Sequence, residues 1–124
     1  MVPRLSKLVL SMNEYTENLK RLKEFYTLED NWDECGGLHI DESIIDFVKS
    51  ILTNLPTSYD VFPTPEGTVQ IEYFKYPKQH LNIEFISTSE VNIFELYNGI
   101  YTKDKQLFNL SLLINRINEF LNCE

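Results

Sequence analysis

The densest group of reactive side chains in this sequence occupies one segment, Leu28–Asp41, which reads LEDNWDECGGLHID. It holds the single tryptophan of the chain, Trp32, together with one of two cysteines and one of two histidines. Its reactive members are Asp30, Asp33, Glu34, Cys35, His39 and Asp41. Three chemistries use such residues: a cysteine nucleophile with a histidine base, a metal site, and hydrolysis by paired carboxylates.

Each of these chemistries lacks part of the pattern that it requires. Cys35 and His39 are close in sequence, but no catalytic-cysteine signature surrounds Cys35. A metal site made from Asp33, Cys35, His39 and Asp41 would mix hard and soft ligands, without a CxxC or HxxxH spacing. Paired carboxylates need a pocket that raises one pKa, and the sequence indicates none. We therefore assign no catalytic residue, no metal ligand and no cofactor, and the pattern disfavours an enzyme.

A structural role accounts better for the composition of this segment. Asn31 and Asp33 are residue types whose side chains bond backbone N–H groups in tight turns, and Gly36 and Gly37 permit positive φ angles. Trp32 is expected to fill the gap between the first two helices and the sheet. An ordered loop of this kind can also be a contact surface. Its candidate binding residues are Trp32, Asp33, Glu34 and His39.

Hydrophobic periodicity predicts a helix on each side of the loop. Before it, apolar residues recur at spacings of mostly three and four. Ser11 and Glu14 match a capping box, so this helix is expected to begin afresh at Met12, with the preceding residues as a separate piece. After the loop, Asp41 is the expected N-cap of a second helix that Pro56 stops.

From Tyr59 onward the apolar period changes to 2, which is typical of strands. The expected strands are a short one at Val61–Phe62, then Thr68–Lys75, His80–Ser87 and Glu90–Tyr97, with one more short strand at Ile100–Thr102 after the Asn98–Gly99 turn. Asp104 is the expected cap of a last helix. The sequence thus predicts a single α+β domain over residues 1–124, in which three helices pack a three- to four-stranded antiparallel meander in the order α-α-β-β-β(-β)-α.

The outward positions of the predicted strands form a polar, acidic face. They include Gln70, Glu72, Asn82, Glu84 and Asn92. This face is either simply hydrated or a docking surface, because aromatic residues at its margin are of the kind enriched in protein contacts. Its candidate binding residues are Glu72, Phe74, Tyr76 and Glu84. Aligned carboxylates such as Glu72, Glu84 and Glu95 would also suit an imitation of nucleic acid.

Charge and composition narrow the class of partner. The 124 residues carry 19 acidic and 11 basic side chains, for a formal net charge of −8. Direct nucleic-acid binding is disfavoured, because it depends on clustered Lys and Arg. We expect no secretory segment and no membrane span, since no run approaches about 20 apolar residues. The expected location is the cytoplasm, with both cysteines reduced.

Several short motifs lie along the chain from the loop to the third expected strand: Asn31-Trp32-Asp33, Gly36, Pro63-Thr64-Pro65-Glu66-Gly67, Val69–Tyr73 and Leu81–Phe85. With these motifs the sequence resembles a widespread group of small, uncharacterised bacterial proteins. The pattern of the group is N-W-D-G-x-G-A, a helix, then P-x-P-x-G-G-I-x-L-E-W and an alternating strand. This chain departs from it at Glu34, Gly37 and Tyr73, where Gly, Ala and Trp are usual. The resemblance spans Leu28–Phe85 and brings no activity, but it implies an accessory or mobile-element protein, such as a toxin–antitoxin or phage-defence partner.

Taken together, these observations predict a non-catalytic protein-binding module of bacterial or mobile-element origin. Within this class, the most specific roles that we expect are those of an antitoxin, an immunity protein or a defence-system inhibitor. The expected partner is another protein, with a homodimer as the alternative. Two other hypotheses stay open: a small hydrolase or nuclease-like enzyme that uses the Asp30–Asp41 loop, and an acidic nucleic-acid mimic.

Overall fold

The structure is a computed structural model that describes the backbone of residues 4–122 and the side chains of residues 12–122. Within these residues the architecture is α+β, with three helices and five strands in the order α-α-β-β-β-β-β-α. The helices are α1 (Arg4–Glu24), α2 (Glu42–Ile51) and α3 (Leu110–Asn122), with 3₁₀ turns at Phe25–Thr27 and Leu52–Asn54. The strands are β1 (Tyr59–Pro63), β2 (Val69–Lys75), β3 (Gln79–Phe85), β4 (Glu90–Tyr97) and β5 (Ile100–Leu107). None of the described helices has the length and apolar character that crossing a membrane requires.

The five strands form one antiparallel meander in which each strand pairs with the next along the chain. Successive side chains of a strand point to opposite faces, so an alternating sequence buries one face and exposes the other. Along most of β2 and β3 every second side chain is fully buried, and these residues are Val69, Ile71, Tyr73, Leu81, Ile83 and Phe85. We call the face that carries them the inner face, and the opposite face the open face.

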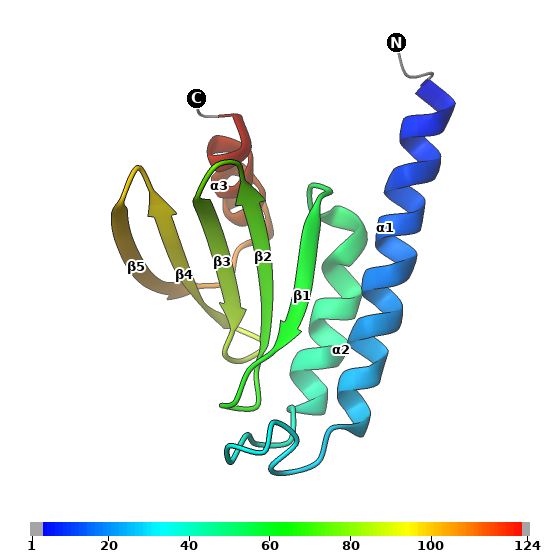
Figure 1. Cartoon of the computed structure of the whole chain (residues 1–124), viewed down its shortest axis with the longest axis vertical. Helices are drawn as coiled ribbons and strands as arrows, with labels where there is room; N and C mark the ends of the chain where they lie inside the picture. The colour runs from blue at the N-terminus through cyan, green and yellow to red at the C-terminus, as the bar shows by residue number, and fades with distance from the viewer. Residues whose placement is uncertain (1–3, 123–124) are drawn as a thin grey trace.

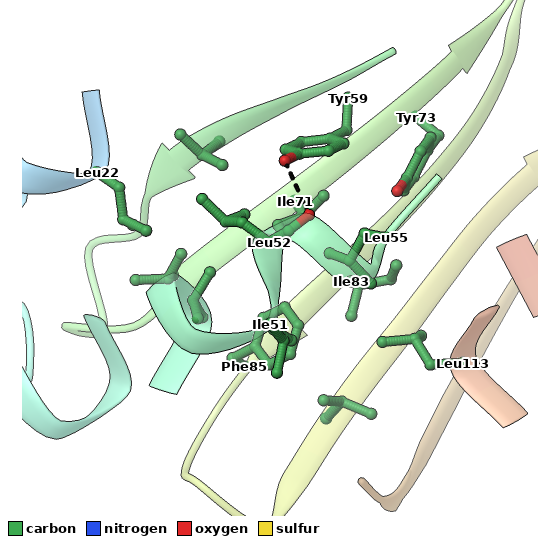
Figure 2. Packing of buried hydrophobic residues seen from close by; sticks show 14 of the residues in the cluster. Leu22, Ile51, Leu52, Leu55, Tyr59, Ile71, Tyr73, Ile83, Phe85 and Leu113 are labelled. Carbon is green, nitrogen blue, oxygen red and sulfur yellow. Dashed lines mark hydrogen bonds between the residues drawn. The ribbon is translucent and has the colours of Figure 1, made fainter. Parts of the chain in front are cut away.

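The helices cover the inner face and the β1 edge of the sheet. Figure 1 shows α3 behind the sheet and α1 and α2 on its β1 side, where α1 contacts β1 and α2 contacts β2. The buried side chains of α2 are Ile44, Ile45, Val48 and Ile51, and those of α3 are Leu113, Ile117 and Phe120. Figure 2 shows how Tyr59 and Tyr73 of the sheet meet the segment after α2, where the Tyr59 hydroxyl donates to the Leu52 carbonyl at 3.4 Å. The core therefore lies between the inner face of the sheet on one side and helices α2 and α3 on the other.

The predicted count of three to four strands was too low. β1 is a full strand that pairs with β2 from Tyr59, opposite Tyr73, to Pro63, opposite Val69. β5 continues to Leu107 rather than ending near residue 102. Its side chains are almost all exposed, so no apolar alternation marks it in the sequence.

Helix boundaries were predicted with mixed success. Asp41 is confirmed as the N-cap of α2, since its Oδ1 accepts from the Ser43 N–H at 2.9 Å. Asp104 caps no helix, because it lies inside β5. Asn109 caps α3 instead, with its Oδ1 accepting from the Leu112 N–H at 3.0 Å.

The capping box predicted at the start of the first helix is also wrong. α1 runs without a break through Ser11 and Met12. Glu14 is engaged elsewhere, because its Oε2 accepts from the backbone N–H of Ser58 at 3.2 Å. A capping box needs a free helix start, and the continuing helix supplies none.

Helix α1 covers the free edge of β1. Asn18 Nδ2 donates to the Tyr59 carbonyl at 3.0 Å, and Arg21 donates to the Val61 carbonyl at 3.4 Å. Uncovered edge strands offer their backbone groups to other chains. This protection leaves β5 as the open edge of the described sheet.

Candidate functional site

The loop between α1 and α2 is held together by its own polar side chains. Asp33 Oδ1 accepts backbone N–H bonds from Cys35 at 3.0 Å and from Gly37 at 2.7 Å. These two bonds hold the pKa of Asp33 below its ordinary value, because they favour the charged carboxylate. Asn31 Oδ1 accepts from the Gly36 N–H at 2.8 Å. The predicted turn-forming role of Asn31 and Asp33 is confirmed.

The two glycines of this loop are needed for different reasons. Gly36 has a φ of +86°, as predicted. Gly37 does not have a positive φ, so the prediction is wrong for it. A Cβ atom at Gly37 would instead lie 2.7 Å from Asp33 Oδ1, so the residue is constrained by space. Asn31 and the exposed Glu34 take positive φ angles of 68° and 61°.

The remaining reactive side chains of the loop are also engaged with its backbone. Asp30 Oδ1 accepts from the His39 N–H at 2.8 Å. His39 Nδ1 lies 2.7 Å from the Leu28 carbonyl oxygen, which can only accept, so Nδ1 carries the proton. Cys35 is exposed, and among the described residues no hydrogen bond joins its thiol to His39. No group of three or more His, Cys, Asp or Glu in the described part is arranged to hold a metal ion.

Trp32 connects the loop to the turn between β1 and β2. Its Nε1 donates to the Leu38 carbonyl at 2.9 Å, and its half-buried ring packs against the core. The Leu38 N–H donates in turn to the Pro65 carbonyl at 2.9 Å, and the Asp41 N–H donates to the Gly67 carbonyl at 2.9 Å. These two backbone hydrogen bonds join the α1–α2 loop to the β1–β2 turn, at the end of the molecule where α1 ends (Figure 1).

The open face of the sheet carries rows of cross-strand neighbours. The first row is Phe62, Gln70, Glu84, Asn92 and Lys105; the second is Asp60, Glu72, Asn82, Phe94 and Lys103; the third is Phe74, His80, Leu96 and Tyr101. No described helix lies on this side of the sheet (Figure 1). Carboxylates therefore lie on β1, β2 and β3 of the open face, lysines lie on its β5 strand, and aromatic rings lie among them.

Glu72 and Glu84 both lie on the open face, as predicted, but in different surroundings. Glu72 Oε1 is 3.6 Å from His80 Nδ1. The His80 ring packs edge-on against Phe74, with ring centroids 4.9 Å apart. Glu84 Oε2 accepts from the Thr68 hydroxyl at 2.7 Å. Glu72 therefore lies beside the imidazole of His80, whereas Glu84 accepts a hydrogen bond from a neutral hydroxyl.

Glu95 lies on the inner face, so its predicted alignment with Glu72 and Glu84 is wrong. Its cross-strand partner on β3 is Leu81, one of the buried residues of that face. Glu95 forms an ion pair with Arg116 of α3. The row of outward carboxylates that a nucleic-acid mimic would use is therefore shorter than expected.

The candidate binding residues are spread along the sheet: Glu72 and Glu84 lie within its open face, and the other six form two groups at opposite ends. Trp32, Asp33, Glu34 and His39 lie in the loop that contacts the β1–β2 turn. Phe74 and Tyr76 lie at the β2–β3 turn, where they are 50% and 89% exposed. The seven residues of β2 separate these ends by about 20 Å, at about 3.4 Å per residue. The two groups therefore do not form one compact site.

Three aromatic residues of the open face were missed by the sequence analysis: Phe62, Phe94 and Tyr101. Basic side chains of the chain itself lie over two of these rings. Arg21 Cζ is 5.9 Å from the Phe62 centroid, and Lys103 Nζ is 5.4 Å from the Phe94 centroid. The period of 2 in the strands was the available signal for their orientation.

A hollow of about 310 Å³ opens on the same face, and Phe62 and Phe94 are among the side chains that line it. Gln70 and Glu84, a cross-strand pair of β2 and β3, lie between these two rings along the sheet. The turn residues 63–66 close one end. This hollow, which we call the Glu84 hollow, combines apolar rings with a carboxylate.

Comparisons of the whole chain add no functional information. No protein-family model, no curated protein and no solved structure matches it. The function is therefore inferred from the open face of the sheet and from the α1–α2 loop.

Proposed function

We propose that this protein is a non-catalytic protein-binding module whose open sheet face binds its partner. The observation that carries the proposal is a sheet face with exposed aromatic rings that no described helix covers (Figure 1). Phe74 and Tyr101 on this face are 50% and 62% exposed. Aromatic side chains contribute large apolar areas to protein contacts, so covering these rings would be favourable.

The charges of the open face favour a partner with a basic surface. Glu72 and Glu84 lie on the two strands at its centre, and the whole chain has a formal net charge of −8. The lysines of β5 are already engaged within the chain, since Lys105 pairs with Glu90 at 3.6 Å and Lys103 lies over Phe94. Complementary charge accelerates association and selects the partner.

Within this class we propose an antitoxin, an immunity protein or a defence-system inhibitor of bacterial or mobile-element origin. The support is the resemblance to the N-W-D bacterial group, together with small size and acidity. A hydrolase that uses the Asp30–Asp41 loop gains no support, because Asp30, Asp33 and Asp41 all bond backbone N–H groups there.

The test is capture of a partner that depends on the open face. Tagged wild-type protein and the variant Phe74→Ser are used to capture proteins from the native host, which are then identified by mass spectrometry. Light scattering on the purified complex gives its stoichiometry. We expect one stoichiometric protein partner with the wild type, and its loss with Phe74→Ser.

A matched control removes an apolar side chain that is at least as exposed but lies elsewhere. Leu112 of α3 is 62% exposed and does not lie on the open face, so Leu112→Ser should retain the partner. Capture of nothing specific by the wild type would contradict the proposal. Equal loss of the partner in both variants would also contradict it, since binding would not depend on the open face.

A further inference from the structure

The Glu84 hollow has the lining of a site for a cationic side chain. Phe62 stands on β1 and Phe94 on β4, so two strands lie between the strands that carry these rings. Gln70 and Glu84 lie on these two middle strands. Each ring already has one basic side chain of the chain itself near it, Arg21 at Phe62 and Lys103 at Phe94, which shows that both rings attract cations. The carboxylate of Glu84 between the two rings adds a full negative charge that neither of these side chains pairs with. The volume of about 310 Å³ leaves room for one long side chain.

The carboxylate of Glu84 is held in place by neutral donors. Oε2 accepts from the Thr68 hydroxyl at 2.7 Å, and Oε1 accepts from Asn92 Nδ2 at 3.3 Å. Thr68 is itself buried and hydrogen-bonded to the hydroxyl of the buried Thr64. A group that is already fixed loses little further freedom when it binds, so Glu84 is preorganised as an acceptor.

No basic side chain of the described part neutralises Glu84. The ion pairs there join other carboxylates: Arg21 with Asp60, His80 with Glu72, Lys105 with Glu90, and Arg116 with Glu95. A carboxylate has about four lone-pair positions, and two hydrogen bonds to Glu84 leave room for more. The half-buried charge is therefore open to a cation from outside.

We propose that the Glu84 hollow binds an arginine side chain of the partner protein. This inference rests on the proposed protein-binding function and deepens it. A guanidinium group is planar and always charged, so it can stack on a ring and bond a carboxylate through two N–H groups at once. The Gln70 side-chain carbonyl beside Glu84 offers a further acceptor for its five N–H donors. A lysine ammonium fits these flat surfaces less well.

The experiment is an NMR titration of the full chain, labelled with ¹⁵N. The probe is the capped tripeptide acetyl-Gly-Arg-Gly-amide, and its matched control contains citrulline, which has nearly the shape of arginine without the charge. We expect saturable shifts of the backbone amides of Phe62, Gln70, Glu84 and Phe94 with the arginine peptide, and none with the citrulline peptide. The lysine analogue should bind more weakly.

Two variants with the same change of charge locate the site. Glu84→Gln should weaken binding of the arginine peptide at least about tenfold, as expected when a hydrogen bond to a charged group is lost. Glu119→Gln, on α3 and away from the open face, should leave binding unchanged. Retained peptide affinity in Glu84→Gln would overturn the assignment, as would equal binding of the citrulline or lysine peptide.

The outcome is separable from that of the proposed function. If the partner is lost with Phe74→Ser but the arginine peptide does not bind, the protein-binding function stands and the arginine site is wrong. If the arginine peptide binds at Glu84 but no partner is captured, the chemistry of the hollow stands and the protein-binding function is wrong.

Discussion

The backbone of Gly67 lies against the carbonyl oxygen of His39 so closely that a Cβ atom at Gly67 would be 2.7 Å from it. Gly67 has a φ of +83°, and its carbonyl accepts from the Asp41 N–H at 2.9 Å. This contact joins the α1–α2 loop to the β1–β2 turn, whose residues 63–66 close one end of the Glu84 hollow. The order of the loop and the shape of the hollow therefore depend on the same few backbone atoms.

Gly67→Ala is expected to destabilise the protein by about 2–4 kcal/mol, because it adds a steric clash to an unfavourable φ. Gly36→Ala is the matched control: its φ is +86°, but a Cβ atom there would meet nothing within 4 Å. The control should lose about 1–2 kcal/mol from the φ angle alone. Urea unfolding followed by circular dichroism measures both. Equal losses would show that the contact with His39 is not tight.

Trp32→Ala is expected to destabilise the protein by about 2–4 kcal/mol, because it removes half-buried ring area and the bond to Leu38. Trp32→Phe keeps most of the ring and loses the N–H donor, so it should cost about 1–2 kcal/mol. Circular dichroism is the appropriate probe, since the fluorescence of the single tryptophan is lost in both variants. Tyr76→Ala, at an 89% exposed position, should stay within about 0.5 kcal/mol of the wild type. A Trp32→Ala variant as stable as that control would show that the ring does not contribute to the core.

The folded protein should lose stability in acid, because Asp33 and Asp41 become protonated there. The pKa of Asp33 is lowered by the backbone N–H groups of Cys35 and Gly37, and the pKa of Asp41 is lowered by the hydroxyl and then the N–H of Ser43. A carboxyl with a lowered pKa in the folded state stabilises the fold above its unfolded pKa. This stabilisation is lost as the pH falls through the folded pKa. The loss is therefore expected below about pH 4.

The variant Asp41→Asn tests this linkage at one carboxyl. Asparagine still accepts the N-cap bond but lacks the charge that favours the helix start. The variant should therefore be less stable than the wild type near neutral pH, and the difference in unfolding free energy should shrink to nothing as the wild-type carboxyl is protonated. Urea unfolding at a series of pH values measures it. A difference that stays constant down to about pH 2 would contradict the lowered pKa of Asp41.

The elements that were predictable are those whose sequence carries their own burial pattern. β2 and β3 alternate over most of their length because one of their faces lies under helices. Asp41 caps α2 as expected, but α2 already ends at Ile51, and Pro56 follows only after the 3₁₀ turn Leu52–Asn54. β5 has no such pattern, because it is an edge strand exposed on nearly every residue. Its extent is fixed by pairing with β4, a contact that the sequence of β5 does not display.

The candidate site was predictable only in part for a related reason. The period of 2 placed Glu72 and Glu84 on the open face correctly. Glu95 was placed on the wrong face, because the apolar cluster around it obscured the parity of β4. The Glu84 hollow requires Phe62 and Phe94 to approach the same strand pair, and this depends on the register across β1 to β4. Register is a long-range property, so local patterns do not supply it.

Asn18→Ala tests whether α1 protects the β1 edge. Asn18 is only 7% exposed, and its Nδ2 donates to the Tyr59 carbonyl at 3.0 Å. Removing this donor leaves a buried carbonyl without that bond, which should cost about 1–3 kcal/mol in urea unfolding. Arg21→Ala should cost less than about 1 kcal/mol, because its bond to Val61 is longer and its side chain is about half exposed.

The same two variants should differ in self-association. A less protected β1 edge offers its backbone groups to a second chain. Light scattering should therefore show oligomers of Asn18→Ala at a lower protein concentration than oligomers of Arg21→Ala. Equal stability losses, with both variants monomeric at every concentration, would show that packing of α1 on α2 alone protects the edge. The bond from Asn18 would then be incidental to the position of α1.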